Sequence, residues 1–231
     1  MKRKGVSKDE GARHARVTCP ASPAGDDLGM VSRSLLAAAA FSLAACASLI
    51  APDVSPEPAA LRSGAYTLDP NHASLIFKVN HLDYSLYVGR FERFDASLDF
   101  DEKDPAAARV EAVIDMATLD VANDAFAQTL TGPDWFDAER FPQARFRSTA
   151  IAVAGANKGA MTGDLTLHGV TRPVTLDVVF NGGARDILRG GYVVGFSARG
   201  SIDRSAFGVD AFDGIVGDAV AIEIEAEFVR R

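Results

Sequence analysis

The sequence contains little cysteine, and its two cysteines, Cys19 and Cys46, both lie near the start. The chain beyond Cys46 therefore forms no disulfide and carries no thiol chemistry. Histidine is also scarce, with four residues in 231. Basic side chains are outnumbered, since 24 Lys and Arg face 31 Asp and Glu, for a net charge of −7. This balance argues against nucleic acid as a partner, because phosphate binding needs clustered basic residues.

No apolar run has the length that a transmembrane helix needs. Residues 1–29 are polar and unpatterned, so we expect disorder there, or a start assigned too early with Met30 as the true initiator. From Met30 the chain has one arginine, an apolar run and then small residues, the layout of a secretory signal. The motif "LAAC" ending at Cys46 resembles the lipobox of bacterial lipoproteins. The sequence predicts a lipoprotein-type signal peptide over 30–45 and a lipid anchor on Cys46; ordinary signal-peptide cleavage after Ala47 is the alternative.

These features predict export to the periplasm and attachment to a membrane through Cys46. Ala47 follows the anchor where an acidic residue could stand, which resembles lipoproteins sent to the outer membrane. Residues 46–63 contain three prolines and few large apolar groups, so we expect a flexible tether. A single domain should then occupy residues 64–231, with an oligomeric state that the sequence leaves open.

Apolar and polar residues alternate through most of this domain, which is typical of β-strands with one buried face. The clearest case is the last run, where Glu223, Glu225 and Glu227 alternate with apolar residues. The pattern predicts eight strands near residues 74–82, 88–100, 109–116, 144–154, 160–168, 172–181, 191–202 and 218–229. The expected fold is therefore all-β, either a sandwich or a closed antiparallel barrel.

One segment, residues 117–143, breaks the alternation. Asn123 or Asp124 can cap a short helix that runs to about Leu130, and a Gly-Pro pair stops it. The aromatic pair Trp135 and Phe136 follows. We expect this helical insertion to plug one end of the barrel or to pack beneath it.

Five stretches in order, "YTLDPNHASLIFKVNHLDYSLYVGRF", "FDAERFPQARFRS", "GDLTLHGVTRPVTL", "GFSARGSIDRSAFGVD" and "VGDAVAIEIEAEF", resemble the YceI-like family of bacterial secreted proteins. The resemblance spans essentially all of residues 64–230. It implies a single lipocalin-like barrel of eight antiparallel strands, whose apolar lumen holds a polyisoprenoid or similar lipid. An eight-stranded barrel has room for one small ligand if side chains do not fill it. The chain departs from the family in the helix, where Phe126-Ala127 and Thr129-Leu130 replace polar pairs.

The candidate ligand-binding residues lie on apolar strand faces or in the insertion. They are Phe77, Val79, His81, Ile114, Trp135, Phe136, Phe146, Val178 and Phe196. Such residues usually fill the core of a small barrel. Small residues on the same faces favour a tunnel instead: Ala96, Ala112, Gly163, Gly195, Ala198 and Ala226. Arg172 and Arg199 are further candidates, as contacts to an anionic headgroup.

His81 falls where the apolar alternation of its strand ends, so we interpret it as a polar group in an apolar interior that also contacts a ligand. The other domain histidines, His72 and His168, lie 9 and 87 residues from it, which matches no compact metal-ligand spacing. The stretch "GFSARG" does not match the nucleophile-elbow motif G-x-S-x-G, because Arg199 stands in place of the second glycine. We therefore expect no catalytic residue, no metal and no cofactor.

The expected function is non-catalytic binding, storage or transport of a long apolar lipid of polyisoprenoid or isoprenoid-quinone type. Two alternatives remain open. One is an enzyme acting on such a lipid in the same lumen. The other is a filled barrel that serves as an interaction module in the cell envelope.

Overall fold

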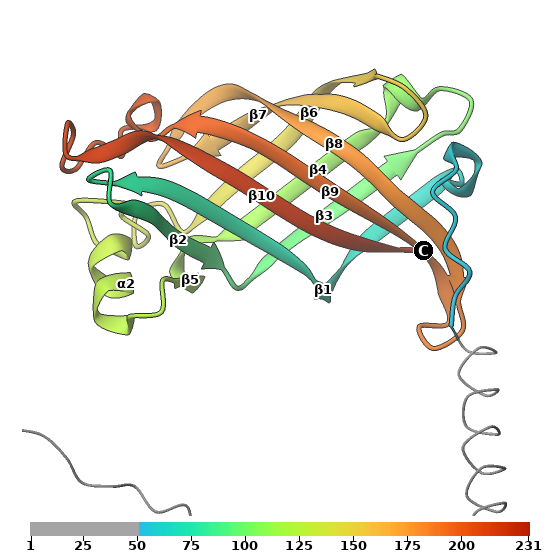
Figure 1. Ribbon diagram of the computed structural model, residues 1–231, viewed down its shortest axis with the longest axis horizontal. Helices are drawn as coiled ribbons and strands as arrows, with labels where there is room; N and C mark the ends of the chain where they lie inside the picture. The colour runs from blue at the N-terminus through green and yellow to red at the C-terminus, as the bar shows by residue number, and fades with distance from the viewer. Residues whose placement is uncertain (1–50) are drawn as a thin grey trace, which may run out of the picture. The chain divides into compact units, whose positions relative to one another are not determined.

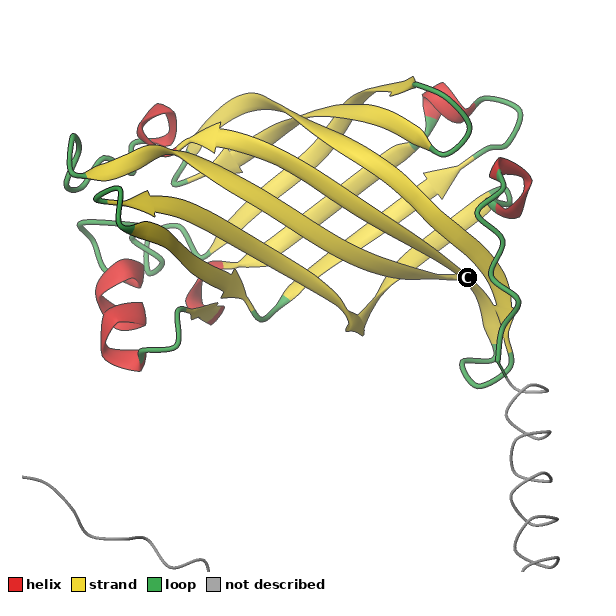
Figure 2. Cartoon of the chain, viewed as in Figure 1, coloured by secondary structure: helices red, strands yellow, loops and turns green. Residues whose placement is uncertain are grey.

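The computed structural model describes residues 51–231, and most of that part is β-strand (Figure 2). The strands are β1 (Gly64–His81), β2 (Ser85–Phe91), β3 (Phe94–Phe100), β4 (Arg109–Asp115), β5 (Leu119–Asp120), β6 (Gln143–Val153), β7 (Lys158–Leu167), β8 (Val170–Asp186), β9 (Gly191–Asp203) and β10 (Val216–Arg230). The 3-10 helix η1 (Pro58–Ala60) precedes β1. Between the strands lie the α-helix α2 (Asp124–Thr131) and the short 3-10 helices η2 (Pro105–Ala107), η3 (Met116–Thr118) and η4 (Arg204–Phe207). The predicted signal peptide and Cys46 fall outside the described residues.

Eight strands close into an antiparallel barrel (Figure 1). The ring runs through β1, β3, β4, β6, β7, β8, β9 and β10, and it closes because β10 pairs with β1 from Tyr66↔Arg230 to His81↔Val216. β2 continues the path of β3 alongside β1, and the two-residue β5 pairs with the edge of β2. The predicted all-β fold, an eight-stranded antiparallel barrel with a short helical insertion, is confirmed.

The first strand begins at Gly64, earlier than the predicted start at residue 74. The sequence "DPNH" at 69–72 has the composition of a turn, but it forms a bulge within β1, where the pairing with β10 shifts between Leu68 and Ala73. An Asp69 carboxylate oxygen accepts the Asn71 N–H at 3.0 Å inside this bulge. Pro70 is tolerated there because a bulge leaves its residue out of the hydrogen-bond ladder.

The predicted strand 88–100 is two strands, β2 and β3, separated at Glu92 and Arg93. The break follows from a change of hydrogen-bond partner. The Glu92 N–H donates to the Thr118 carbonyl at 3.0 Å, and the Arg93 N–H donates to the Thr118 hydroxyl at 3.1 Å. The backbone of η3 thus replaces a neighbouring strand at this point.

The helical insertion closes one end of the barrel. The Asn123 side chain caps α2 by accepting the Phe126 N–H at 3.0 Å, and the helix ends before Gly132, as the sequence predicts. The buried residues Leu119, Val121 and Leu130 form a cluster, and partly buried side chains pack on it: Phe77, Tyr87, Phe91, Ala127, Trp135 and Phe136. We call these nine residues the plug.

The loop between β9 and β10 packs on the same end and depends on one buried cation. Trp135 of the plug stacks on Phe212 of this loop, with ring centroids 5.9 Å apart. Arg204 is only 5% exposed and forms no ion pair with a carboxylate of residues 51–231. Its guanidinium donates instead to four carbonyls, those of Val209 at 2.7 Å, Ala211 at 2.9 Å, Val216 at 3.0 Å and Gly217 at 3.0 Å.

Replacing Arg204 should therefore destabilise the whole barrel. In Arg204→Ala the four carbonyls lose their donor, and each buried unsatisfied group costs about 1–3 kcal/mol. We expect the free energy of unfolding to fall by about 3 kcal/mol or more in urea titrations. The control is the exposed Arg199→Ala, which should change it by less than about 0.5 kcal/mol. Equal effects of the two substitutions would contradict the role assigned to Arg204.

Candidate functional site

A cavity of about 630 Å³ occupies the lumen of the barrel. This volume is in the range of pockets that bind small molecules. Its walls are apolar side chains from the inward faces of all eight ring strands: Leu68, Leu75, Phe94, Leu98, Val110, Ile114, Phe146, Met161, Leu165, Val174, Leu176, Val178, Phe180, Phe196, Ile222, Ile224 and Phe228. The arrangement suits a ligand that is held by dispersion contacts and exclusion of water.

Alanines keep the lumen open. Ala96, Ala112, Ala198 and Ala226 all line the cavity, as the tunnel hypothesis requires. The two glycines named with them act differently. Gly163 lies directly under the ring of Phe146, since a Cβ at this position would lie 2.4 Å from Phe146 Cζ. Gly163 therefore makes room for a wall side chain, and Gly195 is absent from the cavity lining.

Four of the nine predicted ligand-binding residues line the cavity together: Ile114, Phe146, Val178 and Phe196. Phe77, Trp135 and Phe136 belong to the plug instead. The Phe77 ring packs over Gly89, where a Cβ would lie 2.3 Å from it, and Phe136 meets Phe91 edge-on at 6.1 Å. Val79 is half-buried farther along β1. A direct ligand contact by each of these residues stays a prediction.

His81 is exposed, so its interpretation as a polar group in an apolar interior is wrong. It is the last residue of β1, and the turn after it extends past the plug. Leu82 and Asp83 form this turn with positive φ values of 55° and 58°. The imidazole of His81 lies near the ring of Tyr87, with ring centroids 6.3 Å apart. Alternation of apolar and polar residues predicted that His81 points inward. This alternation continues along β1 beyond the part of the strand that encloses the lumen.

The other polar candidates also lie away from the lumen. Arg172 and Arg199 are exposed on the outer face. His72 pairs with Asp69 at 2.8 Å, and His168 Nδ1 lies 3.2 Å from the Phe207 carbonyl. Both histidines hold local backbone, as their sequence context suggests. Residues 51–231 contain no cluster of three His, Cys, Asp or Glu side chains suited to a metal ion.

The cavity opens at the end of the barrel opposite the plug. Its polar lining residues are Glu102, in the turn after β3, Asn157, in the turn after β6, and Lys158, the first residue of β7. The Asn157 side chain donates to the Phe180 carbonyl at 3.3 Å, so Glu102 and Lys158 are the ionisable groups among the residues that line the cavity. We call this end the mouth.

Residues 54–62, here called the strap, belong to the segment predicted as a tether and lie across one side of the mouth. Pro58, Ala59 and Leu61 line the cavity. Periodicity could not reveal them, because the strap has no alternation. The sequence contains one clue to the strap, the large apolar residue Leu61, which lies just before the predicted start of the domain at residue 64.

Two adjacent glycines of β8 receive the strap. Gly183 and Ser55 exchange both backbone hydrogen bonds, at 2.9 and 3.2 Å. The Tyr192 hydroxyl donates to the Ala60 carbonyl at 2.6 Å. A Cβ at Gly183 would lie 2.6 Å from that carbonyl oxygen, and one at Gly182 would lie 2.6 Å from Val54. Only glycine allows the strap to approach β8 so closely.

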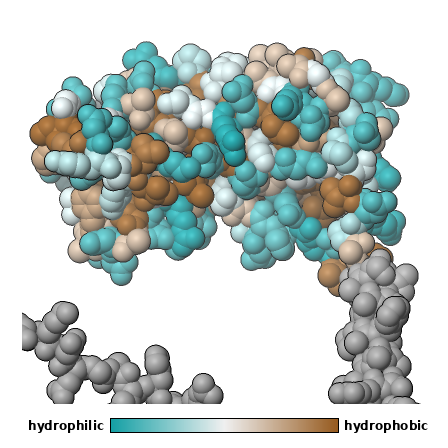
Figure 3. Space-filling view, viewed as in Figure 1, coloured by the Kyte–Doolittle hydropathy of each residue, from teal (hydrophilic) through white to brown (hydrophobic). Residues whose placement is uncertain are grey.

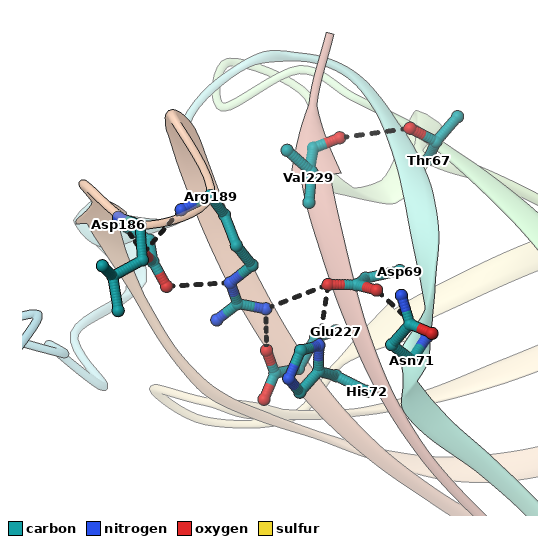
Figure 4. A network of polar contacts seen from close by, with 9 residues as sticks. Thr67, Asp69, Asn71, His72, Asp186, Arg189, Glu227 and Val229 are labelled. Atoms are coloured by element: carbon teal, nitrogen blue, oxygen red, sulfur yellow. Dashed lines mark hydrogen bonds and ion pairs between the residues drawn. The ribbon is translucent and has the colours of Figure 1, made fainter.

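An ionic network fixes the β8–β9 hairpin at the mouth (Figure 4). The Arg189 guanidinium donates to Asp186 at 2.8 Å, to Asp69 at 3.3 Å and to Glu227. Asp186 also accepts the N–H groups of Leu188 and Arg189, at 2.9 and 3.0 Å. The hydrogen bond from the Arg189 side chain has the largest effect on Asp186, and the one from the Arg189 backbone N–H comes next. Together they hold the pKa of Asp186 below its usual value.

The domain is similar in sequence and fold to known proteins. Residues 66–228 match the YceI-like domain. A UPF0312 protein of Photorhabdus laumondii is 39% identical over 159 residues, which cover 69% of this chain and 82% of that one. BcnA of Burkholderia cenocepacia has a TM-score of 0.62 at 32% identity, over 69% of this chain and 98% of that one. A polyisoprenoid binding domain from Saccharophagus degradans has a TM-score of 0.53 at 14% identity, over 72% and 98%, and shares the fold.

Gly183→Ala should release the strap. The added methyl group meets backbone that cannot move aside without breaking the Ser55 hydrogen bonds. We expect the Ser55 N–H to lose its protection in hydrogen exchange, while amides of β4 and β6 keep theirs. Gly195→Ala is the matched control, because its Cβ would meet only Asn181 Cβ at 3.7 Å. Unchanged protection of Ser55 in Gly183→Ala would contradict this account of the strap.

Acid should weaken the barrel through Asp186. An unfolded aspartate has a pKa of about 3.9, and the folded pKa of Asp186 lies below its usual value. Its contribution to stability is therefore complete above the unfolded pKa and is lost as pH falls through the folded pKa. We expect the urea midpoint to drop more between about pH 6 and pH 3 in the wild type than in Asp186→Asn. An equal drop in both proteins would show that other groups set the acid sensitivity.

Proposed function

Because this chain belongs to the YceI-like domain family, we propose that its barrel binds one long apolar lipid, of polyisoprenoid or isoprenoid-quinone type, without transforming it. The observation that carries the proposal is the lumen itself, a cavity of about 630 Å³ with apolar walls and polar residues only at its mouth. Such walls suit an extended hydrocarbon chain. Each methylene moved from water into them contributes about 0.8 kcal/mol.

The absence of polar groups inside the lumen favours binding over catalysis. General acid–base or nucleophilic chemistry needs a titratable side chain within hydrogen-bonding reach of the reacting atom. Along the cavity walls, such side chains occur only at the mouth, as Glu102 and Lys158. A lipid tail bound along the lumen therefore meets no acid, base or nucleophile. The open volume also disfavours a filled barrel that acts only as an interaction module.

Storage or transport in the cell envelope is the role that fits such a carrier. We propose that the protein is exported to the periplasm and anchored in a membrane, with the outer membrane favoured, through lipid on Cys46. The support is the lipobox-like "LAAC" and the alanine that follows it. A non-catalytic carrier at a membrane can shield an apolar tail from water between a donor and an acceptor.

Organic extraction of the purified protein tests the proposal. We expect mass spectrometry of the extract to show one class of long-chain isoprenoid lipid at close to one molecule per protein. Conversion of an added lipid by the purified protein would favour the enzyme instead. An extract without lipid, from protein that also fails to take up added long-chain isoprenoid, would refute lipid binding.

A filled lumen should abolish retention. Ala112 lines the cavity, so Ala112→Phe places a ring in the space that a tail would occupy. We expect the lipid content of the extract to fall at least tenfold with the urea midpoint little changed. Ala125→Phe, on the exposed face of α2, is the matched control and should keep its lipid. Full retention by folded Ala112→Phe would place the lipid outside this cavity.

A further inference from the structure

The β8–β9 hairpin extends beyond the rest of the barrel at the mouth. Pairing of β7 with β8 ends at Lys158↔Val179, whereas β8 and β9 stay paired to Asp186↔Gly191. The strap covers part of the free edge of β8, through the bridge at Gly183. In Figure 1 the turn of this hairpin lies at the lower right, beside the first described residues of the chain.

The turn of the hairpin presents two large aliphatic side chains to water. Ile187 is 68% exposed and Leu188 is 78% exposed. Their backbone is held firmly, because Asp186 accepts the Leu188 N–H and is itself bound by Arg189 (Figure 4). Adjacent exposed aliphatic residues on a fixed turn are unfavourable in water and suit contact with an apolar phase.

The proposed anchor at Cys46 precedes the strap closely in the sequence. The Ser55↔Gly183 bridge is antiparallel, so the residues before Ser55 run toward the hairpin turn. Val54 is 54% exposed and lies against Gly182. Cys46 precedes Val54 by eight residues, which span at most about 29 Å when fully extended.

The plugged end also exposes apolar side chains, but it lies farther from this attachment point. Leu82, Tyr84 and Phe212 are exposed there, at 46%, 87% and 63%, and Figure 3 shows hydrophobic surface at the matching left end. From Gly183 back to Val170, β8 covers about 43 Å at about 3.3 Å per residue. That length exceeds the reach of the residues between Cys46 and Val54.

We propose that Ile187, Leu188 and Val54 contact the lipid surface of the membrane that carries the anchor, so that the mouth faces this membrane. The inference rests on the proposed function, since it gives the lipid ligand its route. The mouth beside these residues is itself apolar, with Pro58, Pro105 and the 61% exposed Val153 in its lining. A tail can then pass between bilayer and lumen with little exposure to water.

A fluorescent probe at the hairpin turn tests the orientation in the full chain. The protein is produced with its own leader in a bacterium that processes lipoproteins, and reconstituted into phosphatidylethanolamine–phosphatidylglycerol vesicles. Leu188→Cys is labelled with an environment-sensitive dye, and Tyr84→Cys, on the plugged end, is the matched control. The unsubstituted chain, treated alike, measures labelling of native cysteines.

Nitroxide-labelled lipids should quench the dye at position 188 at least twofold more than at position 84, with a blue-shifted emission at 188 alone. Equal quenching at both positions, or stronger quenching at 84, would overturn the proposed contact, as would failure of the wild-type chain to float with the vesicles. The extract of the same sample separates the two proposals. Lipid in the extract without quenching at 188 refutes only the membrane contact, and quenching without extracted lipid refutes only the lipid binding.

Discussion

The pairing of β10 with β1 is the constraint on which the rest of the structure depends. It joins the last strand of the domain to the first, and it turns an open sheet into a closed wall with one interior. Every inward side chain then faces seven other strands instead of solvent. An interior of this size is normally filled, and here four alanines leave it hollow. Closure and small residues together therefore create the site, and neither would do so alone.

The two ends of the barrel differ because the chain treats them differently. At one end an aromatic plug and a loop organised by the buried Arg204 exclude water from the lumen. At the other end the wall is completed by the strap, which precedes the region matched to the family and is held by backbone contacts to Gly182 and Gly183. A closed floor with a mouth at one end gives an extended ligand a single direction of entry. The polar residues of the site lie at that mouth.

The features that depend on local sequence patterns, namely the strands, the helix and part of the cavity wall, could be predicted from the sequence. The position of the strap could not, because it depends on the close approach of segments far apart in the sequence. Alternation predicted the strands, the resemblance to the YceI-like family selected the barrel, and the cap at Asn123 with the stop at Gly132 predicted α2. Four wall residues and four alanines were placed in the lumen by the same alternation. The pattern failed at His81, because alternation continues past the point where the barrel encloses space. The pattern gave no information on the strap. The strap can approach β8 closely because Gly182 and Gly183, about 130 residues later in the sequence, have no Cβ atom.

In this barrel, the features that determine affinity for an apolar tail differ from those that determine selectivity between ligands. Dispersion contacts and exclusion of water act along the whole length of a tail, so the free energy of binding grows with the number of methylenes enclosed, at about 0.8 kcal/mol each. The walls carry no directional group that could distinguish one apolar tail from another of the same width. Discrimination between headgroups must therefore arise at the mouth, where Glu102, Lys158 and the strap lie. Pro58, Ala59 and Leu61 of the strap line the cavity, so a segment that precedes the family-matched region contributes to the part of the protein that discriminates between headgroups.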